Sequence, residues 1–240
     1  MTYHSITFPG ARPINEDSVA AMEHDGCYCF IAADGLGGHG KGEVASQKLV
    51  DVFSQTFDMG VEDGEAFLAS AFSLAQDEIL AEQKRQSAGF EMKTTAVALT
   101  IINGKCRWGW VGDSRLYAFR KNKVKSRTLD HSVPQMLVLS GDIKEKQIRC
   151  HPDRNRLLRV LGVEWDDPRY ELSCEMNLAD CQAFLLCTDG FWELIDEKRM
   201  CALLKKSTDA QQWLEAMTAE VAANGAGQEM DNYSAITVMI

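Results

Sequence analysis

Apolar positions along the chain recur with two different spacings, which predict both helices and strands. Apolar residues at intervals of three to four over 44–57 and again over 65–84 place one apolar face on a helix. Alternation at every second position predicts paired strands at 95–102 and 106–111, joined by an Asn-Gly turn. Further strands are predicted at 27–33, 116–120, 181–188 and 234–240, and further helices at 196–205 and 209–223.

The order of these elements favours an α+β fold over a doubly wound parallel sheet. Strand pairs joined by tight turns imply antiparallel sheet, and the helices come in two blocks rather than after each strand. No repeat, low-complexity tract or linker interrupts the 240 residues. We therefore expect residues 1–240 to form a single domain, which is long enough to bury a substantial core.

The charge and the cysteines narrow the function classes and the compartment. The formal net charge of −10 disfavours nucleic-acid and anionic membrane partners, because like charges repel. No apolar run approaches the length of a membrane span, and the N-terminus carries no secretory signal pattern. Eight cysteines without a CxxC pair suggest free thiols in a reducing compartment. We expect a cytoplasmic protein that binds neither nucleic acid nor membrane.

Acidic residues recur where the predicted strands begin and end. They are Glu16 and Asp17 before the first clear strand, Asp34 after it, Asp113 after the 106–111 strand, Asp189 after the 181–188 strand and Asp231 before the last strand. Turn preference alone explains any single Asp beside a Gly, but it is a weak explanation for five such places. Carboxylate oxygens suit hard cations such as Mg²⁺ and Mn²⁺. Two such ions close together can clamp a phosphate and supply hydroxide for in-line attack.

The ordered set of motifs resembles the metal-dependent protein phosphatases of type 2C, in their compact bacterial form. The segments that carry the resemblance span nearly the whole chain: Arg12-Pro13-Ile14-Asn15-Glu16-Asp17, Ala33-Asp34-Gly35-Leu36-Gly37-Gly38-His39-Gly40, Thr94-Thr95, Val111-Gly112-Asp113-Ser114-Arg115, Asp130-His131-Ser132, Cys187-Thr188-Asp189-Gly190 and Asp231-Asn232. The resemblance implies two antiparallel β-sheets stacked face to face, a helical layer outside each, and a flap near residues 131–164 beside the site.

The resemblance also implies hydrolysis of phosphoserine and phosphothreonine in proteins by water activated at a centre of two Mn²⁺ or Mg²⁺ ions, with a third, weaker ion. In this resemblance Asp34 bridges the two ions, helped by the Gly35 carbonyl. Asp189 and Asp231 hold one ion, and Glu16 and Asp17 hold the other, partly through water. Asp113 with Asp189 binds the third ion. The implied partners are phosphorylated proteins and an opposing Ser/Thr kinase.

Two further catalytic candidates follow from the resemblance. Arg12 resembles the arginine that grips the substrate phosphate, a role suited to a planar bidentate donor. Animal members carry a histidine directly after the Asp-Gly pair to protonate the leaving oxygen, but Leu36 stands there in this chain. His39, three residues further on, is the remaining candidate for that general acid, with capping of the loop as its alternative role.

Three other functions fit parts of the sequence. The expected loop over 34–42 matches the pattern GxGxxG. It also matches the P-loop of a nucleotide-binding protein, except that Gly42 stands where Ser or Thr is required. Against this function, Asp34 at the mouth of the loop would repel a diphosphate. Cys150 and Arg156 have the spacing of a cysteine phosphatase, but the residues between them include no glycine. A catalytically silent regulatory module of the same fold is the third alternative. Every expected acid and Arg12 are present, which favours activity.

Overall fold

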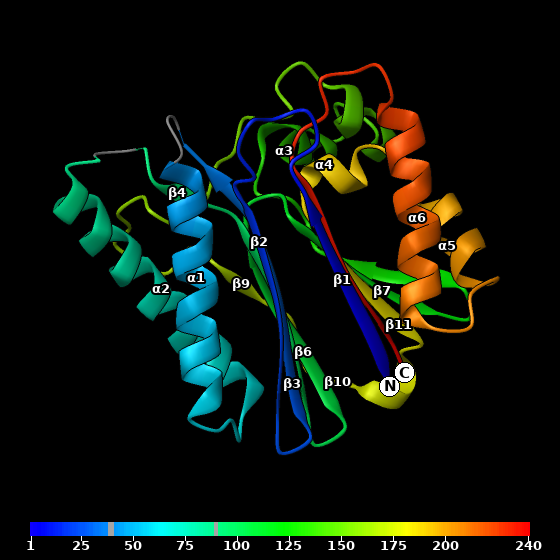
Figure 1. Cartoon of the computed structure of the whole chain (residues 1–240), viewed down its shortest axis with the longest axis horizontal. Coiled ribbons are helices and arrows are strands. Elements are labelled where there is room, and N and C mark those ends of the chain that lie inside the picture. The colour runs from blue at the N-terminus through cyan, green and yellow to red at the C-terminus, as the bar shows by residue number, and fades with distance from the viewer. Residues whose placement is uncertain (38–40, 89–90) are drawn as a thin grey trace.

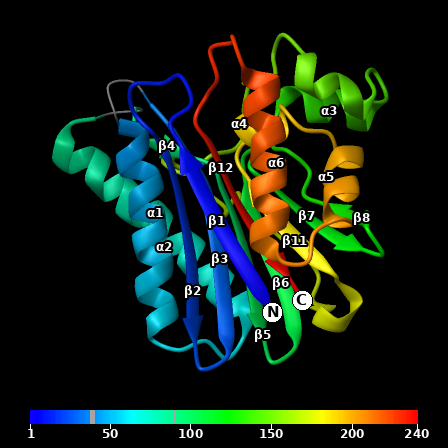
Figure 2. The same cartoon turned by 45° about the vertical axis from the view of Figure 1, so that its right-hand side comes forward.

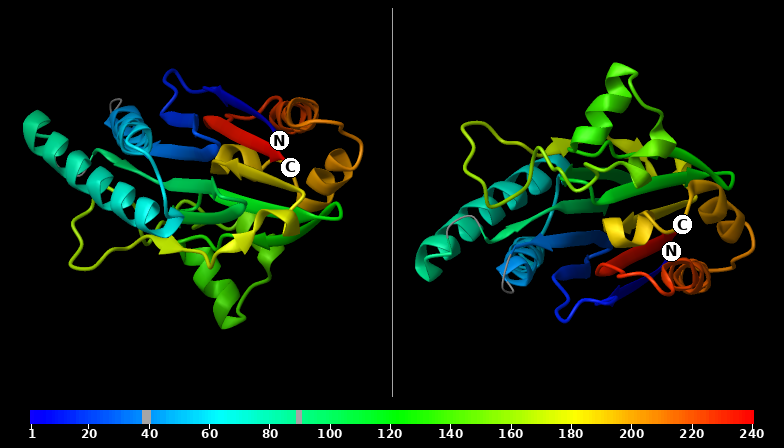
Figure 3. Two further views of the ribbon diagram at one scale, coloured as in Figure 1. Left: turned by 90° about the horizontal axis from the view of Figure 1, so that it is seen from below. Right: turned by 90° about the horizontal axis from the view of Figure 1, so that it is seen from above.

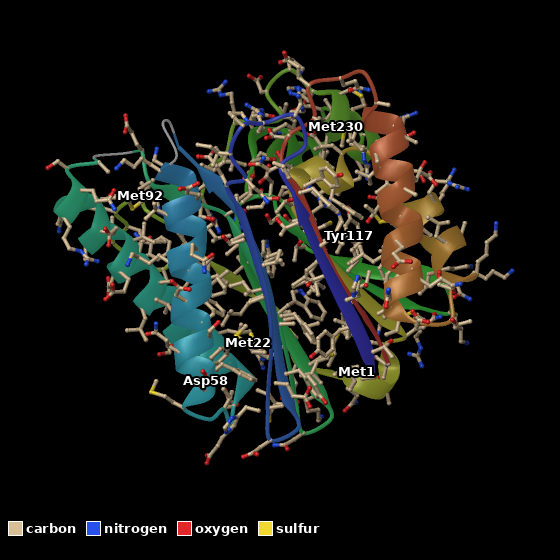
Figure 4. The ribbon with its side chains drawn as sticks, viewed as in Figure 1. Met1, Met22, Asp58, Met92, Tyr117 and Met230 are labelled. Carbon is tan, nitrogen blue, oxygen red and sulfur yellow. The ribbon has the colours of Figure 1, made fainter. Side chains whose placement is uncertain are left out.

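Two antiparallel β-sheets stack face to face, and a pair of helices covers the outer face of each (Figure 1). The computed structural model describes residues 1–37, 41–88 and 91–240. Side chains from both sheets fill the space between them (Figure 4). The α+β sandwich expected from the sequence is confirmed.

The first sheet has the strand order β1-β12-β11-β7-β8. Its strands are β1 (Thr2–Phe8), β7 (Arg115–Arg120), β8 (Lys123–Arg127), β11 (Ala183–Cys187) and β12 (Tyr233–Met239). The two ends of the chain meet here, since β1 pairs with β12 from Thr2 opposite Met239 to Phe8 opposite Tyr233. This pairing brings the segment before β12 next to the segment after β1.

The second sheet has the strand order β10-β6-β5-β3-β2, with β4 paired to β3 and β9 paired to β6. Its strands are β2 (Asp17–His24), β3 (Cys27–Leu36), β4 (Lys93–Thr94), β5 (Ala96–Ile102), β6 (Lys105–Val111), β9 (Glu171–Leu172) and β10 (Met176–Asn177). β5 is buried along its whole length, because one face meets the other sheet and the opposite face meets the helices.

The helices lie in two blocks, as the sequence predicts. α1 (Lys41–Asp58) and α2 (Gly64–Gln86) cover the second sheet, and α5 (Glu197–Leu204) and α6 (Ala210–Gly225) cover the first (Figure 2). Their apolar stripes bury Phe53 and Phe72 on one side of the molecule and Trp213 on the other. Between the sheets lies a third apolar layer, so each sheet is buried on both faces.

The flap (residues 131–164) is the least regular part of the fold. It contains α3 (Val133–Ser140) and the 3-10 helix η1 (Glu145–Cys150), and Figure 3 shows that α3 stands out from the sandwich. A β-bridge between Ser132 and Leu157 closes the base of the flap. In the part of the chain that the structure describes, none of the helices combines the length and the apolar character needed to cross a lipid bilayer.

Some elements differ from the sequence-based expectation. Strands β1 and β2 and helix α3 were not predicted, and β3 continues through Asp34 to Leu36 instead of ending before a loop. β1 is an edge strand whose residues are mostly exposed, so its alternation between apolar and polar positions is weak. Asp34 stays in the strand because its neighbour Gly35 pairs with Thr94 of β4, a contact between segments far apart in the sequence.

Candidate active site

The acidic residues at the strand ends surround a cavity of about 460 Å³ at one end of the sandwich. The lining residues are Arg12, Pro13, Ile14, Glu16, Asp34, Gly35, Leu36, Gly37, Asp113, Asn155, Leu157, Asp189, Asp231 and Asn232. In Figure 4 this end carries Met230, which adjoins Asp231, whereas Asp58 lies at the opposite end. The structure thus brings together at this cavity all the predicted site residues except Asp17, which is not part of its lining, and His39, which lies outside the described residues.

Asp17 and Asp34 face each other on neighbouring strands. They are directly opposite in the β2–β3 register, which puts both side chains on the same face of the sheet. Asp17 is only 7% exposed. Its Oδ2 accepts a hydrogen bond of 2.9 Å from the Thr188 hydroxyl, but its Oδ1 has no hydrogen-bond partner within the described residues. Two like charges in this position destabilise the fold unless something compensates them.

Backbone contacts hold Glu16 beside Asp34. The Gly35 N–H donates to the Glu16 carbonyl at 3.1 Å. A Cβ on Gly35 would lie 2.3 Å from the Gly42 carbonyl oxygen and 2.5 Å from that of Glu16, so only glycine permits this approach. The Asn232 amide accepts from the Glu16 N–H at 2.8 Å and donates to two carbonyls of the loop before β2. Asn232 therefore ties the loop that carries Glu16 to the start of β12.

Asp189 and Asp113 come from adjacent ends of the two sheets. Asp189 is the first residue of α4 (Asp189–Trp192), directly after β11. A Cβ on Gly190 would lie 2.1 Å from the Asn232 carbonyl oxygen, so glycine lets the segments of Asp189 and Asp231 meet. Asp113 follows β6, is 5% exposed, and its Oδ1 has no hydrogen-bond partner within the described residues.

Crowding and burial make the charged form of these acids costly. Burial raises the pKa of Asp17 to about 7, and it raises that of Asp113 to about 7 as well. Burial, followed by the charge of Asp189, holds the pKa of Asp34 well above its usual range. Burial, followed by the charge of Asp113, does the same to the pKa of Asp189. A bound cation would reverse this effect, because it stabilises the ionised carboxylates.

Arg12 lies at the mouth of the cavity. Its Nη2 donates to Asp231 Oδ2 at 2.8 Å, although the two residues are 219 positions apart. The side chains are 56% and 44% exposed, so this ion pair contributes little to stability. Arg12 is the only basic residue among the described residues that line the cavity. Its guanidinium is therefore available to an anion that enters from solvent.

The described residues of the two rival motifs are placed unlike the sites that they would require. The glycine-rich run begins inside strand β3 rather than after it, with Asp34 facing the cavity, and residues 38–40 lie outside the described part. Cys150 is exposed at the end of η1, and Arg156 pairs with Asp153 at 3.4 Å. Neither Cys150 nor Arg156 lines the cavity.

A sequence profile described as protein phosphatase 2C matches residues 12–233. The chain belongs to the protein phosphatase 2C family. It is a serine/threonine protein phosphatase, as the resemblance implied. The matched segment contains every acid that lines the cavity, and Arg12 at its first position.

A relative supports this assignment, and solved structures share the fold of this chain. The serine/threonine phosphatase Stp of Listeria welshimeri is 30% identical over 233 residues, covering 95% of this chain and 90% of that protein. The structure of the serine/threonine phosphatase Stp1 from Staphylococcus aureus superposes with a TM-score of 0.90 at 24% identity, covering 100% of this chain and 95% of that one. The catalytic domain of the phosphatase PstP, solved in complex with 2 manganese ions, has a TM-score of 0.80 at 23% identity, covering 98% and 96%.

Three further residues position the acids of the site through hydrogen bonds. Two of them stand in the motifs of the sequence analysis without an assigned role, and the third was missed. Thr188 holds Asp17, Asn232 holds the Glu16 loop, and Trp192 contacts the segment of Asp113. Thr188 and Asn232 adjoin predicted ligands, which is a signal that the sequence carried. Trp192 looked like any other apolar residue, and no sequence signal distinguished it.

Proposed function

We propose that this phosphatase hydrolyses phosphoserine and phosphothreonine in proteins with the help of two Mn²⁺ or Mg²⁺ ions held at this cavity. The proposed holders are Asp34 and the Gly35 carbonyl for both ions, Asp189 and Asp231 for one, Glu16 and Asp17 for the other, and Asp113 with Asp189 for a weaker third ion. When bound, the ions would supply an activated water for in-line attack on phosphorus.

The observation that carries this proposal is the unmatched negative charge of the cavity. Oxygen donors line it, and among the described residues only one basic side chain, that of Arg12, lines it. Buried oxygens of Asp17 and Asp113 have no hydrogen-bond partner in the same part of the chain. Buried charges are tolerated in proteins when they are paired or coordinate metals. An all-oxygen donor set of this kind suits Mg²⁺ or Mn²⁺. The manganese-bound PstP neighbour, which has the same fold, supports this choice of ion.

The remaining proposed roles belong to Arg12, Asp231 and His39. Arg12 would bind two phosphate oxygens, and substrate entry would draw it away from Asp231. The Asp231 carboxylate would hold a cation when one is bound. His39 stays our candidate for the group that protonates the leaving serine or threonine oxygen. Phosphorylated proteins are the proposed substrates, with a Ser/Thr kinase as the opposing enzyme.

Phosphate release from synthetic phosphopeptides tests the proposed function. We expect the purified chain with Mn²⁺ to hydrolyse phosphoserine and phosphothreonine peptides and to leave a matched phosphotyrosine peptide largely intact. Nucleotide binding without turnover would favour the P-loop alternative. A folded protein with neither turnover nor nucleotide binding would favour the silent regulatory module.

A single substitution separates the metal-dependent reaction from a thiolate mechanism. Cys150→Ser should leave turnover within about twofold of wild type, because Cys150 is an exposed side chain outside the cavity lining. Loss of turnover in this variant would instead identify Cys150 as the nucleophile and contradict the metal-based proposal.

The flap provides a test of substrate selection. Arg154 pairs with Glu193 at 3.1 Å and Arg159 pairs with Glu171 at 3.0 Å, both about half exposed beside the cavity rim residues Asn155 and Leu157. Alanine at Arg154 or Arg159 should lower kcat/KM on a phosphoprotein several-fold more than on p-nitrophenyl phosphate. Surface ion pairs contribute little to stability, so the fold should survive either change.

Comparison of the two substrates shows what these arginines do. Equal losses on both would mean that they support the fold or the cavity itself rather than the protein substrate. Lys144→Ala, at an exposed flap position outside the cavity lining, is the matched control for removal of a positive charge.

A further inference from the structure

The short helix α4 joins the segments of two cavity acids through one indole group. Asp189 begins the helix and Trp192 ends it. The Trp192 side chain is 2% exposed, and its Nε1 donates a hydrogen bond of 3.0 Å to the backbone carbonyl of Asp113. Trp192 is thus covalently three residues from Asp189 and hydrogen-bonded to Asp113, although the two acids follow strands in different sheets.

A buried ion pair supports the face of the same ring. The Arg115 guanidinium carbon lies 3.3 Å from the centroid of the Trp192 ring, within the range of a cation–π contact. Arg115 also makes two hydrogen bonds to Asp130, of 2.8 and 2.6 Å, and both side chains are 1% exposed. Because both charges are buried and paired in a planar bidentate geometry, the guanidinium is a rigid support for the indole.

The flap also contacts the same helix. Arg149 of η1 donates from Nε to the Trp192 carbonyl at 3.1 Å and from Nη2 to the Ile195 carbonyl at 3.3 Å. Its Nη2 also pairs with Glu197 at 2.9 Å. A helix of one turn has little stability of its own, so these contacts decide where α4 and its Asp189 lie.

We propose that Trp192 is a positioning residue that sets the spacing between Asp113 and Asp189, and that Arg149 of the flap holds Trp192 in place. This inference rests on the proposed function, since it concerns how well these two acids can share a cation. The indole N–H positions Asp113 by its hydrogen bond to the Asp113 backbone carbonyl. The helix positions Asp189 because Asp189 is its first residue. Neither Trp192 nor Arg149 lines the cavity, so both act through the residues that they hold.

Trp192→Phe tests the inference because it removes the N–H and keeps an aromatic ring. Trp213→Phe is its matched control. Trp213 is fully buried in the same apolar cluster as Trp192, and its Nε1 also donates to a backbone carbonyl, that of Met200, at 3.1 Å. Mn²⁺ binding is measured on the purified full chain without substrate, by isothermal titration and by the electron paramagnetic resonance signal of free Mn²⁺. Thermal midpoints of both metal-free variants report the stability lost with one buried hydrogen bond.

We expect Trp192→Phe to weaken the lower-affinity Mn²⁺ binding about tenfold. Mutation of a residue that orients a metal ligand typically lowers metal affinity 10–100-fold, and this estimate takes the lower end of that range. Trp213→Phe should bind Mn²⁺ like wild type, with a comparable loss of thermal midpoint. Equal Mn²⁺ affinity in the two variants overturns the inference. Wild-type protein that binds no Mn²⁺ contradicts the proposed function instead, so the two failures are distinguishable.

Arg149→Lys keeps the experiment decisive if Trp192→Phe does not fold. The substitution retains the positive charge but removes the planar group that donates to the carbonyls of Trp192, at the end of α4, and of Ile195, three residues further on. A several-fold loss of the weaker Mn²⁺ affinity supports the inference. Wild-type affinity in this variant overturns it.

Discussion

Removal of divalent cations with a chelator should reduce phosphatase turnover to background, and added Mn²⁺ or Mg²⁺ should restore it. The cavity groups Glu16, Asp34, Asp113, Asp189 and Asp231 around a single arginine, and without cations these acids repel one another. The chemistry needs an activated water, and no side chain on the described cavity wall is a histidine, cysteine or lysine that could activate one in place of a metal.

Thermal unfolding with and without Mn²⁺ measures the same cations independently of activity. A ligand at a hundred times its Kd stabilises the native state by about 2.7 kcal/mol, so the midpoint should rise by several degrees. Circular dichroism of the chelated protein serves as the control that the fold survives. Undiminished turnover in excess chelator would rule out the metal-based mechanism.

Asp34→Asn should abolish most of the turnover and at the same time stabilise the metal-free protein. Asp34 lies directly opposite Asp17 on the neighbouring strand, and the charges of Asp189, Asp113 and Asp231 are nearby. Loss of a residue proposed to hold both ions should lower kcat/KM at least about a hundredfold. Mutation of a residue that only orients a metal ligand already lowers affinity or activity 10–100-fold. Removal of one charge from a repelling cluster should raise the metal-free thermal midpoint.

Asp58→Asn is the matched control for Asp34→Asn, because the exposed Asp58 lies at the opposite end of the sandwich (Figure 4). It should change neither turnover nor midpoint. Both measurements are needed, since an ordinary destabilising change would lower the two together. Full turnover of Asp34→Asn at low Mn²⁺ would remove Asp34 from the site, and a fall in its metal-free midpoint would contradict the charge argument.

Local periodicity was sufficient for the elements with strong amphipathic patterns. Helices α1 and α2 lie where the apolar spacing predicts them, because each buries one regular face. The hairpin of β5 and β6 also lies where it was predicted, although β5 is buried on both faces. The edge strand β1 buries too little for its pattern to be visible, and it forms because β12 pairs with it from the far end of the chain. Pairing partners of this kind are decided by the tertiary structure.

The acids of the site were visible in the sequence, but their surroundings were not. Their place at strand ends and their order along the chain are properties of the sequence alone, and these led to the phosphatase family. That Asp17 faces Asp34, that Arg12 pairs with Asp231, and that burial raises the pKa of the acids depend on contacts across many positions.

Trp192 shows most clearly where the sequence stops being informative. As a sequence position it is one more apolar residue, and its neighbour Asp189 is recognisable without it. Only the fold places its N–H on the Asp113 carbonyl and its ring on the Arg115 guanidinium. The sequence determined which residue types were available for a metal site, because carboxylates and strand ends are local features. The tertiary structure decided how these residues are spaced and held, because hydrogen bonds and burial join segments that the chain keeps far apart.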